Sequence, residues 1–170
     1  MSIFNPLNQT ESAPRILQAG FFIGLAGGSA EIVVVWLYSL LTGGDAAMVA
    51  RHIASAVGLD GSSATAGLAI HMGLAVALGI ALSTTVQMLA GLLSRDGAIF
   101  CFTLGILAAV WVINYFVILP VVCPTFVHLL PYAVTLASKL AFGVTAATTL
   151  NVLKIGSVIA ENLDLAGSLR

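Results

Sequence analysis

Four long apolar runs constrain this chain more than any other feature of its sequence. The runs cover residues 16–41, 64–93, 98–122 and 132–153. Each is long enough to cross about 30 Å of hydrocarbon, which takes about 20 helical residues. In lipid only a helix or a closed barrel satisfies its own backbone hydrogen bonds, and these continuous runs lack the alternation of barrel strands. The sequence therefore predicts four transmembrane helices.

The composition indicates why a bilayer, and not water, is the solvent. Hydrophobic residues make up 59% of the 170 residues and charged residues only 8%, whereas soluble domains are roughly 25% charged. A chain of this size leaves much of its surface exposed, so that surface must be apolar and must face lipid. We predict an all-α integral membrane protein. It is a four-transmembrane-helix bundle in which residues 1–170 form a single membrane domain, with no soluble domain.

The distribution of positive residues predicts the orientation of the helices. The four that flank the predicted helices on one side are Arg15, Arg95, Lys154 and Arg170. The opposite side has only Arg51, and positive flanks favour the cytoplasmic side. We therefore predict cytoplasmic tails at residues 1–15 and 154–170. The N-terminus lacks the positive n-region of a removable signal peptide, and the small size without targeting signals suggests a bacterial inner membrane.

The segment between the first two predicted helices, residues 42–62, is expected to be external. Within it, residues 45–57 are predicted to form a short amphipathic helix that lies on the membrane surface. Its apolar positions are Met48, Val49, Ile53 and Val57, and its polar positions are Arg51, His52 and Ser55.

Two charged residues, Glu31 and Lys139, fall inside predicted helices, where a charge costs about 3 kcal/mol on insertion scales. Counting at about 1.5 Å per residue from the cytoplasmic charges places Glu31, Asn114 and Lys139 at heights of roughly 24, 28 and 22 Å. We predict a buried ion pair between Glu31 and Lys139, with Asn114 hydrogen-bonded to it. At that level we expect Leu78 and Gly79 of the second helix. Such a pair more often fixes helix packing than performs chemistry.

Three glycines, Gly20, Gly24 and Gly28, form a small-residue seam of the kind that lets membrane helices touch. Glu31 shares this side of the helix, because residues three, four or seven apart face the same way. We therefore predict that these glycines pack against another helix and that Glu31 faces protein.

All three histidines, His52, His71 and His128, fall on or near the predicted external side. Counting places His71 and His128 at similar heights, so these two could meet. Imidazole is a ligand for haem iron and copper, which makes a haem or copper site an alternative. The spacing argues against it, because the sequence has no pair of histidines four residues apart and no Cys-x-x-Cys motif.

The sequence has no catalytic motif, phosphate-binding glycine loop or basic cluster, so it predicts neither an enzyme nor a nucleic-acid partner. The preferred hypothesis is a non-catalytic accessory or assembly subunit of a respiratory, photosynthetic or oxygenase complex in the membrane. Its partners are other membrane subunits and lipids, and bound lipids are the only cofactors expected. The alternative is a small oligomeric transporter or channel in which Glu31, Asn114 and Lys139 relay protons or ions. The second alternative is a haem- or copper-binding membrane protein that uses the histidines.

Overall fold

The regular structure of the described part of the chain is entirely helical. The computed structural model describes the backbone of residues 7–59, 63–89 and 96–168 and the side chains of residues 13–59, 63–89 and 97–153. The long helices are α1 (Leu7–Thr42), α3 (Ala64–Met88), α4 (Asp96–Ile113) and α6 (Tyr132–Ser168). The short elements are α2 (Ala46–Ala56), the π-helix η1 (Asn114–Ile118), α5 (Leu119–Val122) and the 3-10 helix η2 (Pro124–His128).

Four stretches of helix are long and apolar enough to cross a membrane. They are Ala13–Thr42, Ala64–Met88, Gly97–Val122 and Tyr132–Leu153. The prediction of four helices that are long and apolar enough to span a membrane is confirmed, and they fit a multi-pass membrane protein. The third span joins α4, η1 and α5 into one helical run.

The helix ends differ from the predicted ones. Helix α1 begins at Leu7 and α6 runs to Ser168, so the described parts of the predicted tails are helical. Extending an existing helix costs far less than nucleating one, which lets α1 continue through Pro14 and α6 continue past its apolar span. Helix α3 ends at Met88 with Leu89 as its cap, and the predicted residues 90–93 lie outside the described residues.

The π-helix η1 is the second difference, because the sequence predicts an uninterrupted α-helix there. Proline has no N–H, and its ring clashes with the carbonyl group four residues earlier. Pro120 is the second residue of α5, which follows η1, and the Leu119 N–H bonds to the Asn114 carbonyl five residues back. A π segment at this point lets the helix pass a proline without ending.

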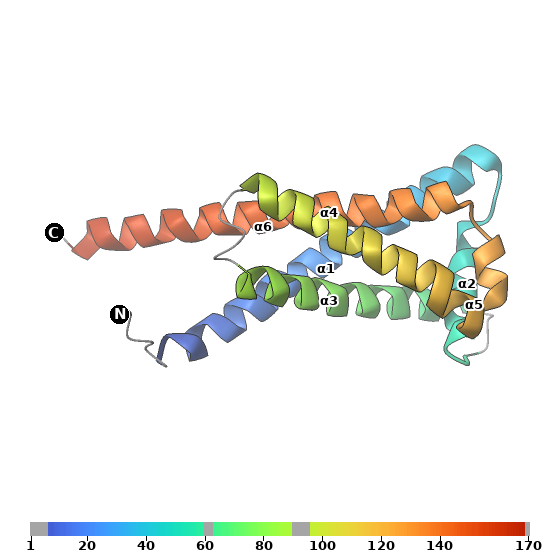
Figure 1. The fold of residues 1–170 in the computed structure, drawn as a ribbon, viewed down its shortest axis with the longest axis horizontal. Helices are drawn as coiled ribbons and strands as arrows, with labels where there is room; N and C mark the ends of the chain where they lie inside the picture. The colour runs from blue at the N-terminus through green and yellow to red at the C-terminus, as the bar shows by residue number, and fades with distance from the viewer. Residues whose placement is uncertain (1–6, 60–62, 90–95, 169–170) are drawn as a thin grey trace.

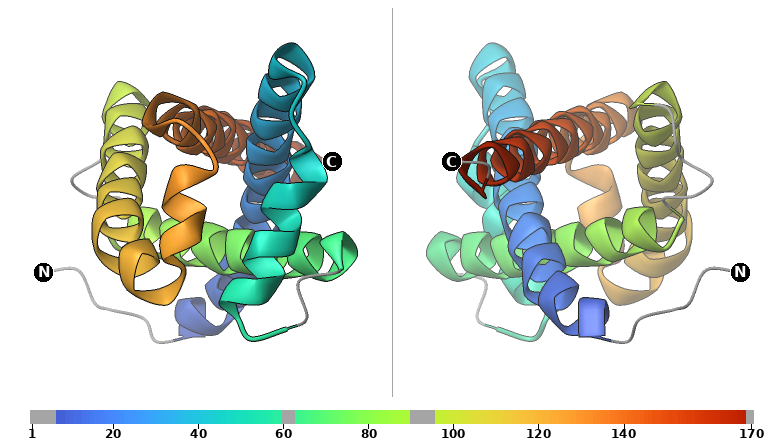
Figure 2. Two further views of the ribbon diagram at one scale, coloured as in Figure 1. Left: turned by 90° about the vertical axis from the view of Figure 1, so that its right-hand side faces the viewer. Right: turned by 90° about the vertical axis from the view of Figure 1, so that its left-hand side faces the viewer.

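Helix α1 is the centre of the packing. It packs against α3 on one side and α6 on the other; α4 packs against α6, and α2 packs against α3. Figures 1 and 2 show that α1 begins, α3 ends, α4 begins and α6 ends at one end of the molecule, which we call the terminal end. The opposite end, which we call the α2 end, holds α2, α5 and η2. Helices α3 and α4 diverge toward the α2 end (Figure 2).

Glycines let α1 and α3 cross at backbone contact. A Cβ atom at Gly20 would meet the Ile80 backbone, one at Gly24 would meet the Val76 backbone, and one at Gly79 would meet both glycines of α1. Two helix backbones can approach this closely only where the side chains are small, which explains the glycines of the seam. Next to this crossing the core consists of large apolar side chains. Those that are fully buried include Ile23, Leu107 and Phe142.

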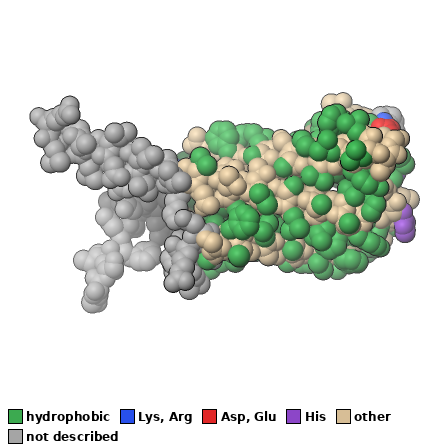
Figure 3. Space-filling view, turned by 90° about the horizontal axis from the view of Figure 1, so that it is seen from above, with side chains coloured by type: hydrophobic (Ala, Val, Ile, Leu, Met, Phe, Trp, Pro, Cys, Tyr) green, Lys and Arg blue, Asp and Glu red, His purple; other side chains and the backbone are tan. Residues whose placement is uncertain are grey.

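Hydrophobic side chains are spread over the whole described part of the face shown in Figure 3, whereas the charged and histidine side chains visible there lie at the α2 end. Exposed large apolar residues include Leu74, Val117 and Val121. Such a surface suits lipid, because a soluble monomer rarely exposes a large continuous apolar patch.

Candidate functional site

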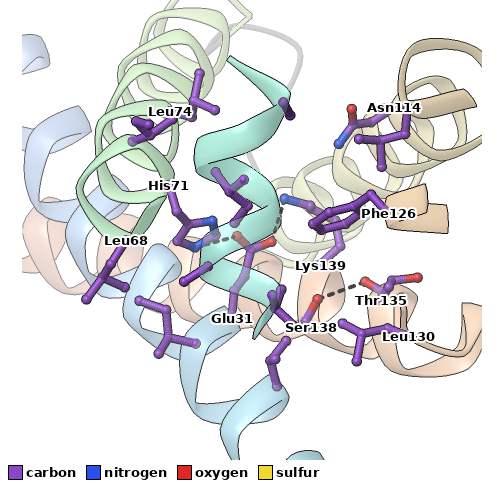
Figure 4. A pocket seen from close by; sticks show the side chains of 18 of the residues that line it. Glu31, Leu68, His71, Leu74, Asn114, Phe126, Leu130, Thr135, Ser138 and Lys139 are labelled. Carbon is purple, nitrogen blue, oxygen red and sulfur yellow. Dashed lines mark hydrogen bonds and ion pairs between the residues drawn. The ribbon is translucent and has the colours of Figure 1, made fainter. Parts of the chain in front are cut away.

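The candidate site is a charged cluster inside the helix packing, centred on Glu31 of α1. Glu31 is only 5% exposed. Its Oε1 lies 2.5 Å from Nζ of Lys139 on α6, and its Oε2 lies 3.5 Å from Nε2 of His71 on α3 (Figure 4). The predicted ion pair is therefore present, and a histidine completes it. Removing either charge would leave the other buried without compensation.

Helix packing one turn away sets the position of Lys139. A Cβ atom at Gly27 would meet the ring of Phe142, so α6 approaches α1 closely there. Lys139 lies one helical turn before Phe142 and Glu31 lies one turn after Gly27, which brings the two charges face to face. Nζ of Lys139 also lies 5.6 Å from the centre of the Phe142 ring, within the range of a cation–π contact.

A similar contact sets the position of His71. A Cβ atom at Gly28 would meet Ala75 of α3, and His71 lies one turn before Ala75. Nε2 of His71 lies 3.4 Å from the Gly28 carbonyl oxygen as well as close to Glu31. Two adjacent glycines of α1 therefore position both partners of Glu31, because Gly27 faces α6 and Gly28 faces α3.

The prediction that Leu78 and Gly79 of α3 lie beside Glu31 is wrong. Gly79 packs on Gly20 and Gly24, more than one turn before Glu31 along α1, and His71 takes the place expected for Leu78 and Gly79. The height count assumed upright helices anchored at equal depth, whereas α1 and α3 cross closely at the glycines. The alignment of Gly28 with a small residue such as Ala75 is the sequence signal that could have placed His71.

Asn114 lines the same cavity as Glu31 and Lys139 but makes no hydrogen bond to either residue. Among the described residues no hydrogen bond joins Asn114 to Glu31 or Lys139. Its side chain points toward the cavity from the start of η1 (Figure 4). The prediction that Asn114 bonds the pair is therefore wrong in this structure, while its placement near the pair is right.

The cavity beside the cluster has a volume of about 400 Å³. Its walls come from α1, α2, α3, α6 and the run from α4 to η2. Most lining side chains are apolar, including Ile32, Val49, Ile53, Leu74 and Phe126. The polar ones are Glu31, His71, Trp111, Asn114, Tyr115, Thr135, Ser138 and Lys139, together with Trp36, which is 51% exposed. The cavity therefore combines a large apolar space with one polar wall.

Helix α2 closes part of the cavity with its apolar side. Val49 and Ile53 line the space, and Ala50 contacts α3 at Gly67. Asp45 caps the helix by accepting the Ala47 N–H. A hydrogen bond from the Arg51 side chain, 2.5 Å from the Asp45 carboxylate, is the main reason that the pKa of Asp45 lies below 3.8. Glycines with positive φ, Gly43 at 70° and Gly58 at 80°, stand on either side of α2.

An aromatic group forms the wall opposite α2, and the sequence reasoning missed it. The Tyr115 hydroxyl lies 2.6 Å from the Val127 carbonyl oxygen and 3.2 Å from that of Leu130, which ties η1 to the turn before α6. The Trp111 indole N–H donates to Oγ1 of Thr135 on α6 at 3.1 Å. The sequence did contain a signal for these contacts, because the predicted helices 98–122 and 132–153 are joined by a short turn and must therefore lie close together.

The three histidines do not gather. His71 belongs to the Glu31 cluster, His52 bonds to the Met48 carbonyl on its own helix, and His128 is exposed and does not line the cavity. In the described part of the chain, no group of three or more His, Cys, Asp or Glu residues could hold a metal ion. The meeting of His71 with His128 that the height count suggested is absent.

The fold and the site define a multi-pass membrane protein with an ion-paired cavity. Comparisons with protein families, with curated proteins and with solved structures found no match for this chain. Its function must therefore be inferred from the cavity.

Proposed function

We propose that this chain is a membrane protein that binds a lipid-soluble small molecule in the cavity beside Glu31. The observation that supports this is the cavity itself, with its volume of about 400 Å³, apolar walls and one polar wall. Small-molecule sites typically have volumes of about 300–1,000 Å³ and a few polar groups in an apolar lining. The ion pair of Glu31 and Lys139 then has two roles, since it fixes the helix packing and forms the polar wall.

The rim of the cavity supports entry from the bilayer. Leu74 on α3 and Val122 on α5 both line the cavity, yet they are 64% and 54% exposed. Both belong to apolar spans, so the rim between them faces the hydrocarbon region of a bilayer. A lipid-soluble molecule can enter there without crossing water.

Binding is better supported than conduction. Toward the terminal end from Glu31, the buried interior includes Phe142, Leu107 and Ile23, each of which is 0% exposed, together with the polar residues Thr103 and Ser83. A proton or ion relay needs polar groups or water along its whole path, and the three apolar side chains offer neither. The cavity needs no such path, so it supports binding more directly than conduction.

The accessory-subunit hypothesis stays a prediction and is compatible with ligand binding. In the predicted orientation, with both ends in the cytoplasm of a bacterial cell, α2 is an external amphipathic helix and the cavity lies toward the external side. The exposed apolar side chains of the spans are then covered by lipid or by partner helices.

The test uses Trp111 as a reporter, because both tryptophans of the chain line the cavity. Trp36 is replaced by Phe, so that Trp111 is the single emitter. The probe is the methyl ester of doxyl-stearic acid, a neutral lipid whose spin label quenches tryptophan on contact. Binding in the cavity predicts quenching that saturates as the probe is added to protein in nanodiscs.

Two matched variants separate the cavity from the bilayer around it. Val49→Phe with Ile53→Phe fills the cavity from α2, whereas Met48→Phe with Ser55→Phe changes residues of α2 that do not line it. Saturable quenching should be lost in the first variant and kept in the second. Equal quenching in both variants, rising linearly with probe, would show partition into the bilayer and remove the proposal.

A further inference from the structure

The polar wall of the cavity holds hydrogen-bond donors that the protein itself does not use. Several lining groups are already engaged. The Tyr115 hydroxyl donates to a backbone carbonyl, the Trp111 indole donates to Thr135, and the Ser138 hydroxyl donates to the Thr135 carbonyl. Among buried and half-buried lining groups, those that keep free donors are the Lys139 ammonium and the Asn114 amide.

Lys139 keeps most of its donors. An ammonium group has three N–H donors, and Glu31 accepts one of them at 2.5 Å. Among the described residues no acceptor takes the other two. Asn114 has two amide N–H donors, and its side chain points into the same space (Figure 4). A donor that faces an apolar cavity without a partner is unfavourable, so this wall favours a ligand that brings an acceptor.

The charges of the lining favour a neutral acceptor. Glu31 and Lys139 are the two lining residues with full charges, and these cancel. An anionic ligand would bring a second negative charge next to Glu31 into an apolar space, without a cation of its own.

From these contacts we infer that the ligand carries a neutral oxygen acceptor, such as a ketone or ester carbonyl, bonded by Lys139 Nζ and the Asn114 amide. Its apolar body fills the space between α2 and α5 and leaves through the rim at Leu74 and Val122. This inference rests on the proposed function and adds the chemistry of the ligand's head. It gives the pair of Glu31 and Lys139 a binding role, with Glu31 holding the ammonium in place.

The experiment compares three probes of equal chain length: methyl undecyl ketone, tridecane and tridecanoic acid. Each displaces the doxyl ester from the cavity, and recovery of Trp111 emission gives its apparent Kd. A hydrogen bond from a charged donor predicts that the ketone binds at least about tenfold more tightly than tridecane. The acid is expected to bind more weakly than the ketone.

Two variants assign the preference to the donors. Glu31→Gln with Lys139→Met removes the ammonium without leaving an uncompensated charge, and it should reduce the preference for ketone over tridecane to nearly onefold. Asn114→Leu should reduce it by a few-fold. Tridecane should bind all three proteins with similar Kd, because its affinity depends only on the apolar walls.

Each contrary result has its own meaning. Saturable binding with no ketone preference, or a preference that survives both variants, overturns the inference and leaves the proposed function intact. Tighter binding of the acid overturns the neutral head in favour of an anionic one. Absence of saturable binding by the doxyl ester, the ketone and tridecane alike removes both the proposed function and the inference.

Discussion

The buried charges of Glu31 and Lys139 make a sharp prediction about stability. Lys139→Met leaves Glu31 buried without a counter-charge and should destabilise the protein by about 3–5 kcal/mol. Glu31→Gln with Lys139→Met should recover part of this loss, because neither charge then remains. The measurement is reversible unfolding in mixed micelles. If the single and the double variants are equally harmless, the pair does not form in the membrane protein.

Asp45 gives a prediction about pH. Its carboxylate accepts hydrogen bonds from Arg51 and then from Ala47, so the folded pKa lies below the ordinary 3.8. A lowered pKa means that this cap stabilises α2 fully above the unfolded pKa and is lost as pH falls through the folded pKa. Carbon-detected NMR of labelled aspartate should show that the Asp45 carboxyl titrates with a lowered pKa. Arg51→Met should raise it, and no change would contradict the assignment to Arg51.

At the level of single residues, the sequence predicted the pair but not its full set of neighbours. Glu31 and Lys139 could be paired because opposite charges in apolar helices have few other partners. The height count did not place His71 beside Glu31, since such a count carries errors whenever helices cross at an angle.

Among the elements, η1 and η2 depend on one hydroxyl group. Tyr115 is 2% exposed, and its single hydroxyl proton is shared between the carbonyl groups of Val127, at 2.6 Å, and Leu130, at 3.2 Å. Tyr115→Phe leaves these groups without a donor and should destabilise the protein by about 1–3 kcal/mol. Thermal unfolding followed by far-ultraviolet circular dichroism measures the change. Tyr132→Phe is the control, because Tyr132 is 56% exposed; equal losses would contradict the role of Tyr115.

The elements were predictable where apolar length decides and unpredictable where it does not. The four spans follow from hydrocarbon thickness. The helical extensions at 7–15 and 154–168 carry no apolar signal, because they prolong helices that are already formed. The π segment arises from Pro120 inside a span that the sequence predicts as one uninterrupted helix.

For the molecule as a whole, the crossing of α1 and α3 carries a prediction with a matched control. Gly79 meets the backbone of Gly20 and Gly24, whereas a Cβ atom at Gly73, on the same helix, would meet nothing within 4 Å. Gly79→Ala should force the helices apart and destabilise by about 1–3 kcal/mol. Gly73→Ala should be neutral or stabilise by up to about 1 kcal/mol, because alanine favours the helix. The free energy of unfolding of both variants in micelles tests this prediction. Equal effects of the two substitutions would contradict the close crossing of α1 and α3 at Gly79.

The packing order of the helices was beyond the sequence reasoning. The glycine seam predicted that α1 touches another helix but not which one, since several helices offer small residues. The order in which α3, α1, α6 and α4 contact one another depends on matched shapes, such as Gly27 with Phe142. The cavity follows from that order. Helices α3 and α4 are the first and last in the series, and they diverge toward the α2 end, which leaves a space between them.

The positive φ angles of Gly43 and Gly58 have a consequence for how stability is distributed. Helix α2 lies between these two glycines, and Ala54 is its one buried residue. Little apolar surface is lost when such a segment opens, so it can unfold locally while the spans stay folded. Backbone amides of α2 should therefore exchange with deuterium much faster than those of α1 or α3, and the bound molecule should slow them. Residence time in the cavity would then be governed by a partial unfolding equilibrium.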